Sequence, residues 1–185
     1  MGKDDDSTNL FKIILDQAAD LDFSDPDKPK DQQTDPTELL IPGVEVSKLF
    51  AVVFWALMHS QEEGNMLEGL DMMTLEQALK AVNGTFQFNV KPSPEAGLTE
   101  KTVQFYVDMR RKGEIVRGPG PAKPKPDCIL TISDRDMIRL ALGQMNPQAA
   151  FLKGKIKVKG NIMLGLRMQS VLMNEVNKMS RASKL

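Results

Sequence analysis

Apolar and polar residues alternate along several short segments in the middle of this chain of 185 residues. Phe86, Phe88 and Val90 are separated by polar residues, and the segment 103–109 has the same period of two. That period predicts β-strands with one buried face and one face in water. Segments 114–117 and 128–132 predict two more strands, and the first three are close enough in sequence to pair antiparallel.

Lysines alternate with other residues at positions 153, 155, 157 and 159, which predicts a fifth strand with a cationic outer face. Lysine on an edge strand commonly prevents edge-to-edge aggregation. The same ladder of Lys153, Lys155, Lys157 and Lys159 could instead attract an anionic head group or a membrane surface. The residues favour neither interpretation over the other.

Two segments have the apolar content of deeply buried helices. Residues 44–59 predict a helix whose run 49–58 is apolar on all sides, so most of its surface should be buried. Residues 162–179 predict a final helix whose apolar surface is wider than one core-facing stripe. Its methionines fit either a core helix with flexible gap-filling side chains or an adaptable apolar binding surface.

Capping residues mark three shorter helices. Thr74 and Gln77 have the spacing of a capping box, Ser133 precedes an apolar periodic segment, and Asn146 precedes a proline. Helices interspersed with a largely antiparallel sheet predict the α+β fold class.

Charge is divided unevenly along the chain. Residues 1–39 hold 11 acidic and 4 basic side chains, a net −7, whereas residues 40–185 hold 14 and 20, a net +6. Residues 1–39 are predicted to be a disordered acidic tail, because they contain too little apolar surface to fold. Within them, residues 10–21 have near-helical apolar spacing, which fits a transient helix or a docking segment for a partner. The total of −1 gives no field that would recruit nucleic acid.

Candidate catalytic groups are scarce. One cysteine, Cys128, lies on an alternating strand, and one histidine, His59, has no evident carboxylate or metal-ligand partner in the sequence. These counts exclude a disulfide framework, a zinc site built on cysteines and a histidine-rich metal site. The residues therefore favour a non-catalytic binding module, without metal or cofactor, whose apolar site lies between the sheet and the helices.

Residues from Asp127 onward resemble the sterol carrier protein-2 domain, the non-specific lipid-transfer family. The run Gly143-Gln-Met-Asn-Pro-Gln148, followed by Gly154-Lys-Ile-Lys157 and Gly160-Asn161, matches the central motif of that family in order and spacing. The resemblance is best over 75–172 and weaker back to residue 47, within an expected domain at 40–182.

The resemblance implies a five-stranded, mostly antiparallel mixed sheet, covered by helices that enclose an apolar tunnel. That tunnel would hold a fatty acid, a fatty acyl-CoA or a sterol. The positions that match tunnel-lining residues of the family are Phe86, Phe88 and Phe105 on the sheet, Met145 and Phe151 in the middle wall, and Leu164, Met168, Gln169 and Leu172 on the covering helix.

The last three residues, Ser183, Lys184 and Leu185, match the peroxisomal import signal. With the resemblance, they predict a lipid carrier of the peroxisomal matrix that is recognised by the import receptor. The alternative is an accessory module that presents acyl substrates to peroxisomal β-oxidation enzymes, and in that case the acidic tail would be decisive. Related domains are also fused to dehydrogenases or thiolases, but the 74 residues before Leu75 are too few for such a catalytic domain.

Overall fold

The computed structural model of the protein describes residues 10–21, 29, 31, 36–64 and 66–182. Its centre is a five-stranded sheet in the order β3-β2-β1-β4-β5. The strands are β1 (Thr85–Lys91), β2 (Val103–Asp108), β3 (Glu114–Arg117), β4 (Cys128–Ser133) and β5 (Lys157–Gly160). Neighbouring strands are antiparallel except β1 and β4, which are parallel. The predicted α+β class and mixed sheet are confirmed.

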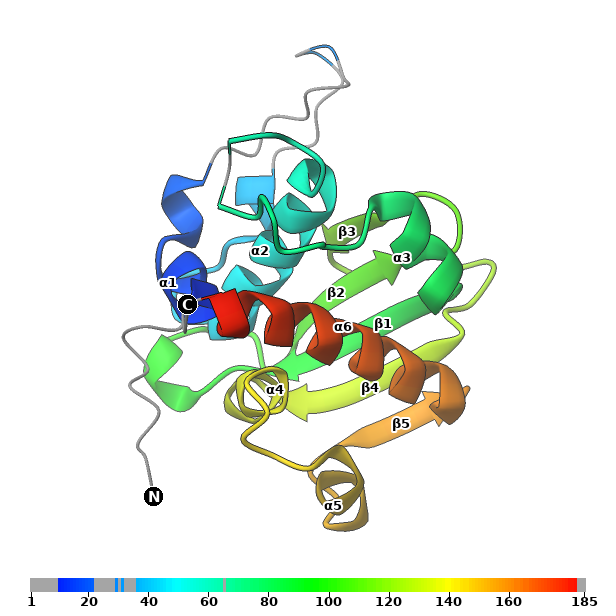
Figure 1. The fold of residues 1–185 in the computed structure, drawn as a ribbon. Coiled ribbons are helices and arrows are strands. Elements are labelled where there is room, and N and C mark those ends of the chain that lie inside the picture. Colours follow the sequence, from blue (N-terminus) through cyan, green and yellow to red (C-terminus); the bar gives the residue numbers. More distant parts are fainter. Residues whose placement is uncertain (1–9, 22–28, 30, 32–35, 65, 183–185) are drawn as a thin grey trace.

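Helices cover one face of the sheet, and α6 crosses the strands over most of its length (Figure 1). The α-helices are α1 (Leu10–Asp16), α2 (Glu45–His59), α3 (Leu75–Val82), α4 (Asp134–Ala141), α5 (Pro147–Leu152) and α6 (Ile162–Ala182). Short 3-10 helices are η2 (Ala18–Asp20), η4 (Pro36–Leu39) and η5 (Pro94–Ala96). The two long helices predicted from the sequence are therefore α2 and α6.

The helix ends follow the predicted caps. Thr74 and Gln77 form both hydrogen bonds of a capping box at the start of α3, each 3.0 Å long. The Ser133 hydroxyl accepts a hydrogen bond from the backbone N–H of Asp136 in α4. The Asn146 side chain accepts one from Ala149 in α5. These caps satisfy N–H groups that the first turn of each helix leaves unpaired.

A buried carboxylate fixes α2 against α4. The Asp134 carboxylate accepts hydrogen bonds from the backbone N–H groups of Val46, at 2.7 Å, and Glu45, at 2.9 Å. Burial raises the pKa of Asp134 above its ordinary value, although these two hydrogen bonds act in the opposite direction. Asp134 thus begins one helix and caps another that lies 88 residues earlier in the chain.

Residues 10–20 belong to the segment 1–39 that is predicted to be disordered, and the structure describes them as α1 and η2 packed on the fold. Ile14 and Ala18 are completely buried, and α1 contacts both α2 and α6 (Figure 1). The apolar content of the whole segment is low, but helical geometry places residues four positions apart, such as Ile14 and Ala18, on one surface. Residues 1–9, 22–28, 30 and 32–35 lie outside the described part of the chain.

The fifth strand is shorter than predicted. β5 begins at Lys157, whereas Lys153 ends α5 and Lys155 lies in the turn between them. Lys157 and Lys159 pair with residues of β4 that alternate with Leu130, which places them on the face opposite the helices. The alternating lysines therefore form a ladder at only two of the four expected positions.

The other face of the sheet carries polar side chains that bond to one another. The Gln104 amide donates to the Asn89 side chain at 3.1 Å. On the same face, Gln87 accepts a hydrogen bond from the backbone N–H of Gly120 in the proline-rich loop. Polar side chains thus occupy the uncovered face of the sheet, and apolar side chains occupy the face that the helices cover.

Candidate functional site

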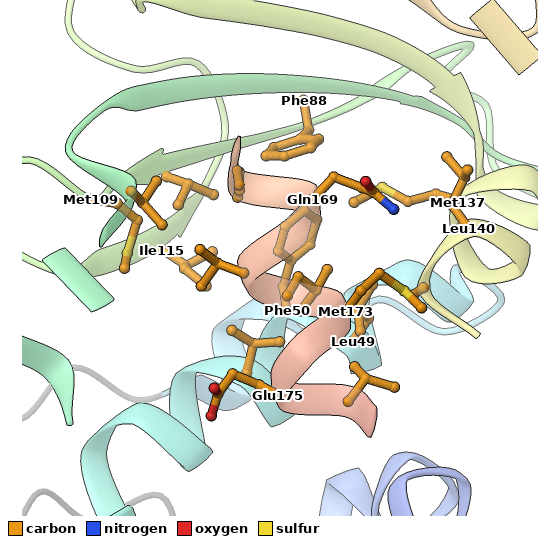
Figure 2. Close-up of a pocket in the computed structure, with 18 of the residues that line it drawn as sticks. Leu49, Phe50, Phe88, Met109, Ile115, Met137, Leu140, Gln169, Met173 and Glu175 are labelled. Carbon is orange, nitrogen blue, oxygen red and sulfur yellow. The ribbon is translucent and has the colours of Figure 1, made fainter. Parts of the chain in front are cut away.

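The covered face of the sheet and the helices α2, α4 and α6 enclose a cavity of about 170 Å³ (Figure 2). Its walls are almost entirely apolar. They include Leu49, Phe50, Val53, Ala56 and Leu57 of α2, Phe88, Val107, Ile115, Leu130 and Ile132 of the sheet, Met137, Leu140 and Ala141 of α4, and Met168, Val171, Leu172 and Val176 of α6. Seven lining residues are methionines, so the wall can adapt to the shape of an apolar occupant.

Two polar side chains line the cavity, and they lie in different parts of it. Figure 2 shows the Gln169 amide pointing toward Met137 and Leu140, with Glu175 away from α4. The Glu175 carboxylate accepts a hydrogen bond from the Met73 backbone N–H at 3.0 Å and one from Lys178 at 2.8 Å. The Glu175 carboxylate is therefore already hydrogen-bonded within the protein. Gln169 is the polar side chain of the lining that lies toward α4.

A second, shallower hollow adjoins the cavity at the end of α4. It shares Leu140, Gln169 and Met173 with the cavity, and the loop 143–147 completes it. Gln144 and Asn146 of this loop are exposed. The hollow has a polar rim and lies beside the part of the cavity that Gln169 lines.

Four of the nine residues that match tunnel positions of the resembled family line the cavity. They are Phe88, Met168, Gln169 and Leu172, one from the sheet and three from the covering helix α6. Gln169 and Met168 are neighbours in sequence and both face the interior, because the apolar wall of α6 is wider than one stripe.

The other five residues lie elsewhere. Phe86 and Phe105 are buried on the covered face of the sheet, and the centre of the Phe50 ring, on α2, lies 4.7 Å from that of Phe105. Leu164 is buried against Gly84, where a Cβ atom would collide with its side chain. Met145 lines the adjoining hollow, and Phe151 is exposed on α5.

Sequence reasoning did not assign the wall formed by α2. Leu49, Phe50, Val53, Ala56 and Leu57 all line the cavity. The signal that could have identified them is the run 49–58, which is apolar on all sides and therefore must face more than one buried surface. Phe50 connects this wall to the sheet through an edge-to-face contact with Phe88 at 5.2 Å.

The two candidate catalytic side chains are buried outside the cavity lining. Burial, and to a lesser extent Asp127, raises the pKa of the Cys128 thiol to about 11, so the thiol stays protonated at neutral pH. His59 Nδ1 lies 2.7 Å from a carboxylate oxygen of Glu62, which corrects the expectation that it has no carboxylate partner. The spacing of three residues at a helix end could have revealed this pair.

Within the described part of the chain, no three histidine, cysteine or acidic residues gather in a way that could hold a metal ion. No described helix is both long and apolar enough to span a membrane. The targeting residues Ser183, Lys184 and Leu185 lie outside the residues that the structure describes.

About half of the chain is similar to a sterol carrier protein and to an oleate-induced peroxisomal protein. It is 39% identical over 97 residues to sterol carrier protein 2 of Oryctolagus cuniculus, which covers 52% of this chain but 16% of that protein. It is 35% identical over 105 residues to the oleate-induced peroxisomal protein POX18 of Candida maltosa, covering 56% of this chain and 78% of that protein.

A solved structure has the same fold. Sterol carrier protein 2 from Yarrowia lipolytica in its apo form superimposes with a TM-score of 0.53 and 26% identity, over 76% of this chain and 98% of that one. Residues 65–173, more than half of the chain, match the model of the SCP-2 sterol transfer family. This match includes the sheet, α4, α5 and the first part of α6, and so the protein belongs to the SCP-2 sterol transfer family.

Proposed function

We propose that this protein binds a fatty acid, a fatty acyl-CoA or a sterol in its apolar cavity and carries it, without catalysing a reaction. The observation that carries the proposal is the cavity itself, enclosed between the sheet and the helices α2, α4 and α6 and lined by seven methionines. Its position between sheet and helices is where the resemblance to the family expects a ligand tunnel. The protonated, buried Cys128 and the hydrogen-bonded Glu175 offer no reactive group to a bound lipid.

Binding would be driven by the transfer of the acyl chain out of water. Each buried methylene contributes about 0.8 kcal/mol. Apolar contacts distinguish poorly between chains of similar length, because one methylene more or less changes the binding free energy by only about 1–3 kcal/mol. We therefore expect broad specificity for long apolar ligands.

The cavity must enlarge to take a whole ligand. Its 170 Å³ is below the roughly 300–1,000 Å³ that is common for ligand sites. Methionine side chains can change rotamer at low cost, so we expect the wall of α6 to move when an acyl chain enters. The polar head of the ligand should face the hollow beside Gln169, because the protein itself satisfies Glu175.

A pair of tryptophan substitutions on α6 tests the cavity as the binding site. Met168→Trp places a large ring in the cavity, whereas Met163→Trp changes a side chain that is 69% exposed. We expect Met168→Trp to weaken binding of a fluorescent fatty acid by about tenfold or more, because it occupies the space of the ligand. Met163→Trp should bind like the original protein. Equal affinity of the two variants, both shown to be folded by circular dichroism, would disprove the proposed site.

The proposed site of action is the peroxisomal matrix. The chain ends in Ser183, Lys184 and Leu185, and a relative is an oleate-induced peroxisomal protein. A fluorescent protein fused to the N-terminus should collect in peroxisomes. Removal of the last three residues should leave the fusion dispersed, since the import receptor would have nothing to recognise. Peroxisomal fluorescence that survives this deletion would rule out the proposed signal.

A second candidate function is the presentation of acyl substrates to peroxisomal β-oxidation enzymes. It is favoured by the net charge of −7 in residues 1–39, which could attract a basic partner. Because Ile14 and Ala18 are core residues, deletion of the whole segment would not be a clean test. Replacing Asp4, Asp5 and Asp6 by Asn changes neither of these core residues. A lower rate of β-oxidation by the peroxisomal enzymes, with unchanged lipid binding, would support presentation. An unchanged rate would exclude a role for these three charges.

A further inference from the structure

Large apolar side chains are exposed on both sides of β5. Phe151 and Leu152, at the end of α5, are 43% and 83% exposed, and Ile162 and Met163, at the start of α6, are 45% and 69% exposed. These four are most of the six large apolar side chains that are exposed in the described part of the chain. Large apolar side chains that gather on a protein surface commonly mark an interaction site.

The same part of the chain is cationic and has no acidic residue. From Met137 to Asn174 the sequence contains six basic side chains and no aspartate or glutamate. Residues 151–155 are all exposed, so Phe151 and Leu152 lie directly beside Lys153 and Lys155. Lys157 and Lys159 continue the basic residues along β5, at the edge of the sheet that lies next to α5 (Figure 1).

The opposite edge of the sheet is different. There, beside β3, Lys112 lies 3.4 Å from Glu114 and Arg117 lies 3.8 Å from Glu100. Among the described residues, none of the four lysines at 153, 155, 157 and 159 forms an ion pair. Protection of the edge strand against aggregation would require only charged residues on that strand. It does not explain why the apolar side chains of Phe151 and Leu152 are exposed beside those charges.

This surface is next to the hollow that adjoins the cavity. The loop 143–147 lines that hollow and leads directly into α5, with Asn146 as the cap of the helix. A partner that contacts α5 would therefore lie close to the hollow. A lipid passing between that partner and the cavity would have only a short distance to cross.

We propose that the α5–β5 surface, formed by Phe151, Leu152, Lys153, Lys155, Lys157 and Lys159, docks on anionic lipid bilayers. The two apolar side chains enter the boundary between head groups and acyl chains, while the lysines contact lipid phosphates. This proposal rests on the proposed carrier function. Docking would bring the hollow to the membrane from which a lipid is collected or to which it is delivered.

Charge complementarity and apolar exposure together favour a bilayer over other polyanions. Nucleic acid would gain nothing from an exposed Leu152, and Phe151 is the one aromatic ring of this surface available for base stacking. An acidic protein would be expected to offer a defined counterpart to the apolar pair. A bilayer needs no defined counterpart, because its head groups accept lysine at many positions.

Co-sedimentation with vesicles tests the proposal on the full chain. We expect binding to vesicles of phosphatidylcholine with 30% phosphatidylserine, much weaker binding to pure phosphatidylcholine, and loss of binding as salt shortens the electrostatic range. The double variant Lys153→Glu/Lys155→Glu should bind at least about 25-fold more weakly, since each lysine near an anionic surface contributes about fivefold and each new glutamate adds repulsion. The control Lys101→Glu/Lys112→Glu makes the same change of charge near the opposite edge and should bind normally.

A second pair of variants isolates the apolar contribution. Leu152→Ser should weaken vesicle binding severalfold, whereas Leu98→Ser, at another exposed leucine in a loop, should not. Binding that does not distinguish anionic from neutral vesicles, or that is equal in the matched variants, would overturn the proposal, as would an absence of vesicle binding.

Failure of docking and failure of the carrier function can be told apart. Binding of a fluorescent fatty acid in solution, without vesicles, should be the same in all four variants, because none of the changed residues lines the cavity. A protein that binds fatty acid but no vesicle disproves only the docking surface. A protein that binds vesicles but no fatty acid disproves the carrier proposal.

Discussion

α2 and α6 both line the cavity, yet they are held in different ways. α2 is buried along most of its length, and the Asp134 carboxylate fixes its first turn. α6 is anchored near its start by Leu164 on Gly84 and farther along by Glu175 on Met73. Val176 and Met179 are also buried toward its end, whereas the cavity-lining residues between these anchors are only half-buried. The difference indicates that one wall of the cavity is rigid and that the other can bend or shift to admit a ligand.

The attachment at the start of α6 should contribute most to stability. Leu164→Ala removes a buried side chain that fills the space above Gly84, and we expect it to lower the free energy of unfolding by about 2–5 kcal/mol. Met163→Ala, one residue earlier and exposed, should change it by less than about 0.5 kcal/mol. Urea unfolding measures both. Similar effects of the two variants would mean that α6 is not anchored through Leu164.

The attachment of α2 should come next. Asp134→Ala leaves the backbone N–H groups of Val46 and Glu45 without their acceptor, and we expect a loss of about 2 kcal/mol in unfolding free energy. Asp134→Asn keeps one acceptor oxygen and should have an intermediate effect. If Asp134→Ala were as stable as the original protein, the fixed position of α2 would have to depend on apolar packing alone.

The attachment near the end of α6 is weaker because it lies closer to solvent. Glu175→Ala removes the acceptor of the Met73 N–H and should cost about 1 kcal/mol. Glu175→Gln, which retains an acceptor oxygen, should cost less. If this end holds the movable wall, stopped-flow measurements should show faster uptake of a fluorescent fatty acid by Glu175→Ala. Unchanged uptake would indicate that the ligand enters without movement of this end.

The local features of this fold could be predicted because their causes are local. The alternation at Phe86, Phe88 and Val90 reflects one covered sheet face, and the caps at Thr74 and Ser133 depend on residues three positions away. The limits of β5 could not be predicted, since the alternating lysines extend beyond the residues that pair with β4. A pattern of charge alone does not require a strand.

The cavity wall was predictable only in part, because it depends on where the helices lie over the sheet. Phe88 and Phe105 are neighbours across two strands and share one face, but Phe50 of α2 lies against the Phe105 ring. Phe50 also contacts the Phe88 ring, yet Phe88 lines the cavity and the completely buried Phe105 does not. The packing of Ile14 on the fold likewise depends on surfaces distant in sequence. The alternation of apolar and polar residues identifies the covered face of the sheet. Tertiary packing decides which residues of that face line the cavity.

The smallest predicted effect is a pH dependence of the attachment of α2. Burial raises the pKa of Asp134 above the 3.8 of an ordinary aspartate, so the folded state binds this proton more tightly than the unfolded chain does. The resulting stabilisation is fully present below the unfolded pKa and is lost as pH rises through the folded one. The unfolding free energy of the original protein minus that of Asp134→Asn should therefore decrease from pH 4 upward and then become constant. Urea titrations of both proteins at several pH values give this difference, in which other carboxylates cancel. An increase with pH would show that the hydrogen bonds from Val46 and Glu45 outweigh burial, and that α2 is held chiefly by the charge of the carboxylate.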